Sequence, residues 1–122
     1  MHELPIVKGI LEAVIEYATE NHAAKVSKVV LTVGSLHDLI PEWVQKYFRF
    51  ASSGTIAEEA IIVINKTPII CRCKACECNF VFHLSAQPEQ QHCPECGSKD
   101  FVLVSGRELI IQKIEICKED VD

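Results

Sequence analysis

The sequence predicts an α+β fold, in which two helices pack on a three-stranded sheet and a zinc-ribbon subdomain is inserted before the last strand. Three observations lead to this prediction. The chain has 122 residues, 48% of them hydrophobic and 24% charged, which is enough to bury one real core. Apolar residues recur at helical spacing in two segments and are dense and β-branched in three others. Six of the seven cysteines fall within residues 70–106.

The first helix is expected over residues 4–22, where apolar side chains recur every three or four positions and lysines and glutamates occupy the opposite face. The second is expected over residues 41–52, because Pro41 is suited to a first helical turn. Trp43 belongs to its apolar side, and we expect it to pack in the core or at a domain interface. Three further segments are rich in β-branched residues and are expected to form strands: 25–34, 60–66 and 109–116.

The cysteine-rich segment divides the chain into two expected domains. Residues 1–69 together with 107–122 contain both helices and all three strands, and should form one α/β domain. Residues 70–106 should form the other. A unit of fewer than about 40 residues rarely folds on apolar burial alone, so this segment needs an additional stabilising cross-link.

Charge and composition exclude several classes of protein. The net charge of -5 provides no broad positive field for a phosphate backbone, so nucleic acid is not an expected partner. No apolar stretch approaches the roughly 18 residues that span a bilayer, and no basic leader precedes the first helix. The odd number of cysteines, without an export signal, argues against a disulfide framework. We therefore expect a cytoplasmic protein whose clustered cysteines bind metal.

Two CxxC pairs are predicted to provide this cross-link by binding one metal ion. Cys73 and Cys76 form one pair, Cys93 and Cys96 the other, in the pattern C-x2-C-x16-C-x2-C. This spacing lies within the range of zinc ribbons, in which two tight turns aim four thiolates at one ion. Four sulfur ligands leave no position open for water or substrate, so the predicted zinc is structural.

Two alternatives remain for this site at the level of sequence. Thiolate ligands alone do not exclude iron in a rubredoxin-like site. Cys71 and Cys78 bracket the first pair, and either could enter the metal shell if the register slipped. We assign both as spare, because only Cys73 and Cys76 give the CxxC spacing.

The first three residues, Met1, His2 and Glu3, are a second candidate metal site. The free α-amine, the His2 amide nitrogen and the His2 imidazole can chelate one ion in fused rings. Glu3 adds a further amide nitrogen or a carboxylate. A nitrogen-rich set of this kind suits square-planar Ni²⁺ or Cu²⁺. The alternative is an ordinary solvated terminus without metal.

With MHE at its start, and CRCKACE and CPECG in its second half, the sequence resembles the HypA/HybF family of hydrogenase-maturation nickel metallochaperones. Further resemblance lies in residues 33–34, in 54–60 and in the terminal strand. The resemblance implies that His2 is the essential nickel ligand, with Met1 and Glu3 contributing. It implies structural zinc at the two CxxC pairs. An acidic residue after Gly34 could complete the nickel site, and Asp38 is the nearest candidate.

The resemblance also implies a function and a set of partners. The expected function is that of a non-enzymatic carrier, which binds Ni²⁺ transiently and delivers it during maturation of [NiFe] hydrogenase, with urease as a further target in some relatives. The expected partners are a HypB-type nickel GTPase and the large subunit of the hydrogenase, without nucleic acid or membrane, and the chain is expected to be a monomer or weak homodimer. The alternative function is that of a zinc-ribbon module that binds nucleic acid or protein and has no role in nickel delivery.

Overall fold

The computed structural model describes residues 3–118, which form two compact units. The described part of unit 1 comprises residues 3–32, 39–65 and 110–118. Unit 2 comprises residues 33–38 and 66–109. No helix among the described residues is both long and apolar enough to cross a membrane.

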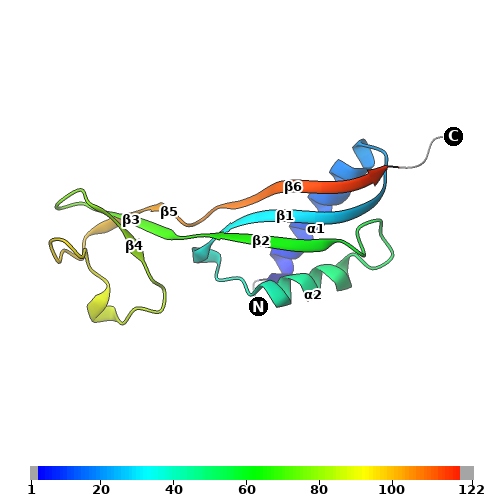
Figure 1. The fold of residues 1–122 in the computed structure, drawn as a ribbon. Helices are drawn as coiled ribbons and strands as arrows, with labels where there is room; N and C mark the ends of the chain where they lie inside the picture. Colours follow the sequence, from blue (N-terminus) through cyan, green and yellow to red (C-terminus); the bar gives the residue numbers. More distant parts are fainter. Residues whose placement is uncertain (1–2, 119–122) are drawn as a thin grey trace. The chain divides into compact units, whose positions relative to one another are not determined.

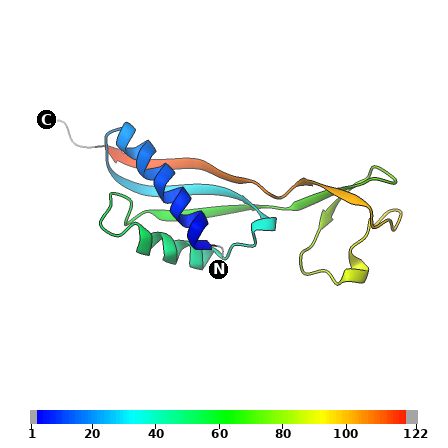
Figure 2. The same cartoon turned by 180° about the vertical axis from the view of Figure 1, so that it is seen from behind.

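Unit 1 contains both helices and a three-stranded sheet, as the sequence predicted. The helices are α1 (Glu3–Glu20) and α2 (Pro41–Ala51). The sheet has the order β2-β1-β6, formed by β1 (Ala23–Gly34), β2 (Ile61–Thr67) and β6 (Leu109–Lys118). In Figure 2, α1 crosses in front of the strands and α2 lies beside β2. Figure 1 shows the opposite, open face of the sheet.

The core of unit 1 lies between the helices and the sheet. From α1 it receives Val7, Ile10, Val14 and Ala18, whose spacing puts them on one face of a helix. From β1 it receives alternate residues such as Leu31, and from α2 it receives Val44 and Phe48. The helical stripe read from the sequence of α1 is thus confirmed as core.

Hydrogen bonds at the strand ends fix the directions within the sheet. The amide of Val26, near the start of β1, donates to the carbonyl of Ile56, just ahead of β2. At the far ends, Ser35 Oγ donates to the carbonyl of Thr67 at 2.7 Å. The starts of β1 and β2 therefore lie together, as do their ends, so the two strands are parallel and α2 is their crossover helix.

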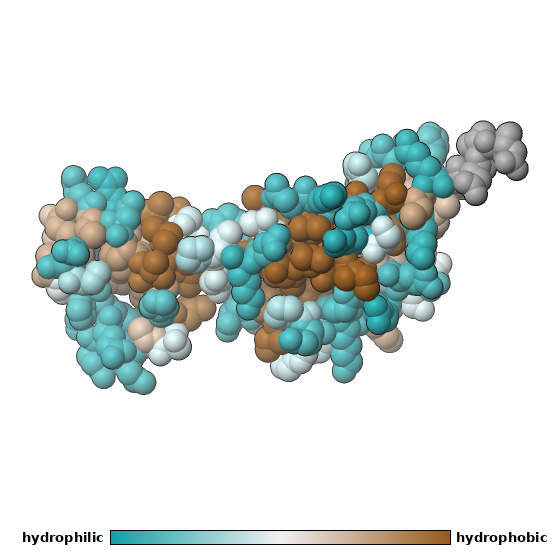
Figure 3. Space-filling view, viewed as in Figure 1, coloured by the Kyte–Doolittle hydropathy of each residue, from teal (hydrophilic) through white to brown (hydrophobic). Residues whose placement is uncertain are grey.

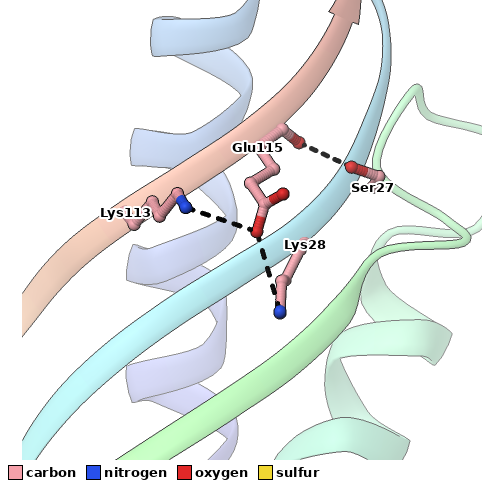
Figure 4. A network of polar contacts seen from close by, with 4 residues as sticks. All are labelled: Ser27, Lys28, Lys113 and Glu115. Atoms are coloured by element: carbon pink, nitrogen blue, oxygen red, sulfur yellow. Dashed lines mark hydrogen bonds and ion pairs between the residues drawn. The ribbon is translucent and has the colours of Figure 1, made fainter.

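The third strand, β6, runs antiparallel to β1. Ser27 Oγ donates to the Glu115 carbonyl at 3.1 Å, and Thr32 Oγ1 lies 3.2 Å from Gln112 Oε1, so one strand ascends as the other descends. Figure 4 shows the Glu115 carboxylate between two lysines, Lys28 of β1 and Lys113 of β6, at 3.7 and 3.8 Å. These side chains are largely exposed, so the pairs contribute little to stability.

Unit 2 contains the second sheet, which is antiparallel and has the order β4-β3-β5. Its strands are β3 (Ile69–Cys73), β4 (Asn79–Phe82) and β5 (Phe101–Ser105). On one face, the ring of Phe101 packs against those of Phe80 and Phe82, with centroids 5.4 and 5.8 Å apart. These three half-buried rings form a small aromatic cluster in the ribbon.

The end of β1 belongs to unit 2, where it contacts the segment that connects β5 to β6. The amide of Gly34 donates to the Glu108 carbonyl at 2.6 Å, and the amide of Leu36 donates to the Gly106 carbonyl at 3.0 Å. The backbones approach so closely that a Cβ built on Gly34 would lie 2.0 Å from the Gly106 oxygen. Only glycine fits at Gly34 without a shift of the backbone.

The Glu108 carboxylate lies in the same segment between β5 and β6 and forms hydrogen bonds there. It accepts hydrogen bonds from Thr67 Oγ1 and from the amide of Gly106. These two donors, the Thr67 hydroxyl first, hold the pKa of Glu108 below its ordinary value. The negative charge of Glu108 is therefore favoured by the folded state of unit 2.

The structure corrects the prediction for Trp43. In α2, Val44 and Phe48 are buried, whereas Trp43 is 47% exposed and Phe50 is 80% exposed. Trp43 is therefore not a core residue. Apolar side chains also gather on the open face of the unit 1 sheet, where Figure 3 shows a broad hydrophobic area over β1, β2 and β6. Ile61 of β2 and Ile110 of β6 are half-exposed apolar side chains of this sheet.

Candidate metal centre

Unit 2 brings four cysteine sulfurs together. The Sγ atoms of Cys73, Cys76, Cys93 and Cys96 all lie within 4.8 Å of one another. Those of Cys73 and Cys96 are 3.5 Å apart, and those of Cys76 and Cys93 are 3.6 Å apart. None of the four forms a disulfide. The two CxxC pairs, distant in sequence, thus form one cluster.

Two turns with the same hydrogen bonds place these sulfurs. In the first turn, the amide of Cys73 donates to the Cys78 carbonyl, and the amide of Glu77 donates back to the Cys73 carbonyl, both at 2.9 Å. In the second, the amide of Cys93 donates to the Ser98 carbonyl and the amide of Gly97 to the Cys93 carbonyl, both at 2.8 Å. Each turn is therefore closed by hydrogen bonds between its first and last residues, and its two thiols face those of the other turn.

The two turns differ at the residue that follows the second cysteine. Both positions adopt a left-handed conformation, with φ of 77° at Gly97 and 61° at Glu77. Glycine takes this conformation without steric cost, whereas a residue with a Cβ is disfavoured there. The first turn is therefore the more strained of the two.

Backbone amides stabilise negative charge at the cluster. The N–H groups of Cys76 and Ala75 point at the Cys73 sulfur and lower the pKa of Cys73 to about 6. Cys73 and Cys93 are fully buried, whereas Cys76 and Cys96 reach the surface. At neutral pH the cluster thus offers a thiolate that is ready to bind a cation.

The donor set fits zinc. Four sulfurs at about 2.3 Å from one ion would lie about 3.8 Å from one another in a tetrahedron, close to the two separations of the sulfur atoms given above. All four donors are soft thiolates, and together they fill a tetrahedral shell without an open position. The cluster is therefore compatible with structural zinc, which gives unit 2 the character of a zinc-ribbon subdomain.

The other three cysteines lie outside this cluster. Cys71 is buried in β3, opposite Phe80 and Leu103, and burial raises the pKa of its thiol. Cys78 is half-buried and its Sγ contacts the Asn79 carbonyl at 3.4 Å. Cys117 is exposed on β6. The four converging sulfurs thus include neither Cys71 nor Cys78, which the sequence alone left open. Cys78 nevertheless lies near the cluster, since burial and the neighbouring Cys93 raise the pKa of its thiol.

Of the predicted nickel ligands, Met1 and His2 lie outside the described residues. Glu3 is the first residue of α1 and is only 2% exposed, although a glutamate three residues from a terminus would be expected to reach solvent. A carboxylate at a helix N-terminus is favoured by the helix dipole. Asp38 closes the short 3₁₀ helix Ser35–His37 with φ of 50°, and its amide donates to the Ser35 carbonyl. Nothing in the sequence of Glu3 signalled its burial.

Comparison with known proteins decides the family. The family described as "Hydrogenase/urease nickel incorporation, metallochaperone, hypA" matches residues 1–116. The chain belongs to the HypA family. Hydrogenase maturation factor HypA of Chlorobium luteolum is 36% identical over 98% of this chain and 98% of the relative. HypA of Aquifex aeolicus is 30% identical over 95% of this chain and 97% of the relative.

Solved structures of HypA proteins share the fold. The solution structure of the Ni metallochaperone HypA from Helicobacter pylori matches with a TM-score of 0.63 at 24% identity, covering 98% of this chain and all of the other. A second HypA solution structure matches with a TM-score of 0.65 at 25% identity, covering 98% of both chains. Membership in the HypA family makes the chain a metallochaperone of nickel incorporation in hydrogenase maturation, a role described as carriage of a metal rather than as catalysis.

Proposed function

We propose that this HypA protein binds Ni²⁺ at its N-terminus and hands it on during maturation of [NiFe] hydrogenase. The observation that carries the proposal is the family match from residue 1, which includes the triplet of Met1, His2 and Glu3. His2 is the proposed essential ligand, through its imidazole and amide nitrogens. Met1 contributes its α-amine, and Glu3 a nitrogen or its carboxylate.

Delivery requires a nickel site that is specific but labile. A terminal chelate can open without unfolding the protein, so we expect micromolar affinity, on the order of -8 kcal/mol. Imidazole and amine nitrogens must lose protons before they bind metal, so nickel should dissociate as the pH falls through their titration range.

The two metals have separate roles in this proposal. The α/β domain of residues 1–69 and 107–122 carries nickel, which is cargo. The ribbon domain of residues 70–106 holds zinc at Cys73, Cys76, Cys93 and Cys96 as a resident structural ion. The closed sulfur shell supports this division, because it leaves no position from which an ion could readily be passed on.

The proposed partners follow from the same role. Nickel reaches the hydrogenase large subunit with the help of a HypB-type nickel GTPase, and urease is the proposed second target of the cargo. We place this exchange in the cytoplasm. Neither nucleic acid nor membrane takes part, which agrees with the net charge of -5.

Metal titration of untagged, zinc-loaded protein tests the proposal. Calorimetry should detect one nickel ion per chain, and His2→Ala should abolish that binding while the zinc content and the circular dichroism spectrum stay unchanged. The control is His22→Ala, which removes a histidine from the turn after α1. Unchanged nickel affinity in His2→Ala, or an affinity that does not vary with pH, would contradict the proposed site.

A zinc ribbon that binds nucleic acid or protein without nickel remains the alternative. It would give wild-type protein that retains one zinc, binds no nickel, and shifts DNA or RNA with a strong dependence on salt.

A further inference from the structure

Helix α2 has a second apolar face that points to solvent. Four residues on one side of α2 form this outer face: Ile40, which caps the helix, and Trp43, Tyr47 and Phe50. Ile40 is 39% exposed, and Trp43 and Phe50 are more exposed still, while Tyr47 is half-buried. The face is distinct from the buried one formed by Val44 and Phe48. Three of the chain's eight aromatic residues therefore lie on the outer face of α2.

The spacing of the outer face is self-complementary. Its members follow one another at intervals of three, four and three residues, which is the a/d spacing of a helix that packs against another helix. The intervals read the same in both directions. Two copies of α2 that run antiparallel about a two-fold axis near Gln45 would therefore pair Ile40 with Phe50 of the partner subunit, and Trp43 with Tyr47 of the partner subunit.

The charges beside this face fit the same arrangement. Glu42, Lys46 and Arg49 are exposed and lie along one flank of the outer face. In an antiparallel pair related by a two-fold axis, like flanks face each other, so Glu42 near one end would lie beside Arg49 of the partner subunit near the other. Among the described residues, none of these three side chains forms an ion pair within the chain. The two glutamates that share a surface pocket with Arg49 are engaged elsewhere: Glu58 accepts from the Gly54 amide, and Glu59 pairs with Lys25.

We propose that the outer face of α2 is the surface through which two copies of this chain associate. The contact is an antiparallel pair of α2 helices, with aromatic and aliphatic side chains in its centre and Glu42–Arg49 pairs at both ends. The stripe is about 15 Å long, and the two copies of Lys46 lie close to the two-fold axis, so association is weak and depends on protein concentration.

Two other occupants fit the surface less well. A membrane-binding helix that recognises anionic lipid usually carries four to eight basic residues, whereas α2 presents two and also a glutamate. An unrelated acidic helix would leave Glu42 facing like charge. Self-association is the arrangement in which each charged end of α2 meets its opposite.

Sedimentation velocity on full-length, zinc-loaded protein under reducing conditions tests the proposal over a range of concentrations. The wild type should shift from monomer to dimer as concentration rises, and emission of Trp43, the single tryptophan, should move to shorter wavelength over the same range. Phe50→Ser should weaken association by about tenfold or more, because the two-fold axis repeats the change and the Phe50–Ile40 contact is lost twice.

Charge variants distinguish this arrangement from other partners. Glu42→Arg and Arg49→Glu should each weaken the dimer by about fivefold, and the double swap should restore it to within about twofold of wild type. Lys46→Gln should strengthen self-association, because it removes like charges at the axis, whereas it would weaken the binding of an acidic partner. The matched controls are Tyr17→Ser, which removes a half-exposed aromatic from α1, and Cys117→Ser, which excludes an intermolecular disulfide.

Several outcomes would overturn the proposal. A monomer at all concentrations would do so, as would a dimer that Phe50→Ser does not weaken or that the double swap fails to restore. Binding of wild-type protein to phosphatidylglycerol vesicles, without self-association, would assign the surface to a membrane. Nickel titration of the same variants is an independent measurement, so a failure here leaves the proposed nickel site standing.

Discussion

The two units of the molecule are stabilised in different ways. In unit 1, large apolar side chains such as Val14, Leu31 and Phe48 are fully buried between two helices and a sheet. In residues 66–109 of unit 2, all of which the structure describes, the buried hydrophobic side chains are Ile69, Cys71, Cys73 and Cys93. Cys73 and Cys93 are members of the sulfur cluster. Unit 1 is thus held by extensive apolar burial, whereas this part of unit 2 buries little besides its cysteines.

The difference shows how a short chain can contain a second folded unit. The aromatic contacts around Phe101 bury too little surface to stabilise a ribbon of this size alone. We expect a bound ion to supply the missing free energy, because the four-sulfur site exists only in the folded ribbon. Each unit should therefore fail under a different treatment.

The largest effect should come from loss of the zinc ligands. Structural zinc contributes about 10–16 kcal/mol of apparent binding free energy in small zinc domains, so Cys93→Ser should unfold the ribbon. Amide hydrogen exchange should then show loss of protection in β3, β4 and β5, with protection retained in α1 and β1. Cys117→Ser is the control and should change neither. Intact protection of the ribbon in Cys93→Ser would show that its apolar packing suffices.

A cavity in the core of unit 1 should give the next largest effect. Phe48→Ala should lower the free energy of unfolding of unit 1 by about 3–5 kcal/mol, because the ring is fully buried. Urea denaturation measures this loss, and the zinc content should remain one per chain. Phe50→Ala removes the same ring from the surface of α2 and should change stability by less than about 0.5 kcal/mol in dilute protein. Equal losses in the two variants would contradict the placement of the core.

The close contact at Gly34 should tolerate no side chain. Gly34→Ala should destabilise unit 2 by about 1–3 kcal/mol or more, because the new methyl group meets the backbone of Gly106 rather than a flexible side chain. Gly9→Ala is the matched control: a Cβ built at Gly9 meets no atom within 4 Å beyond the adjoining helix backbone, and alanine is the better helix former by up to about 1 kcal/mol. Thermal unfolding should move in opposite directions for the two variants.

The smallest effect concerns Glu108 and appears only in acid. The pKa of Glu108 is lowered in the folded state, so its contribution to stability is complete above the pKa of the unfolded chain, near 4.3, and is lost as the pH falls through the folded value. Glu108→Gln should therefore lose less stability than wild type on acidification. Thr67→Val, which removes one donor, should reduce the same difference. Both are measured by urea denaturation as a function of pH, and identical pH profiles would contradict this role.

Much of this organisation could be predicted from the sequence, because periodicity and spacing report local chemistry. The apolar stripe of α1, the β-branched strands and the two CxxC pairs each carry their signal within a few residues. The fold class and the clustering of Cys73, Cys76, Cys93 and Cys96 follow from these signals and are confirmed. The nickel ligands Met1 and His2 remain a prediction.

The features that were missed depend on tertiary contacts. The helical pattern of α2 has apolar residues on two faces, and spacing alone does not show which face meets the sheet. Of the two expectations for Trp43, core or domain interface, the first was therefore wrong. The burial of Glu3 has no local signature either. The attachment of residues 33–38 to the ribbon arises from the approach of Gly34 to Gly106, more than 70 residues away in the chain.

The two cysteine turns differ in backbone strain, and this difference should set the order in which they bind the metal ion. Gly97 lets its turn form before any ion arrives, whereas Glu77 holds a conformation that an L-residue adopts at a cost of about 1–2 kcal/mol. In the metal-free chain, the turn that contains Cys93 and Cys96 should thus be preformed and should bind the ion first. Cys73 and Cys76 would close over it last, which makes them the pair that opens first when the ion is withdrawn.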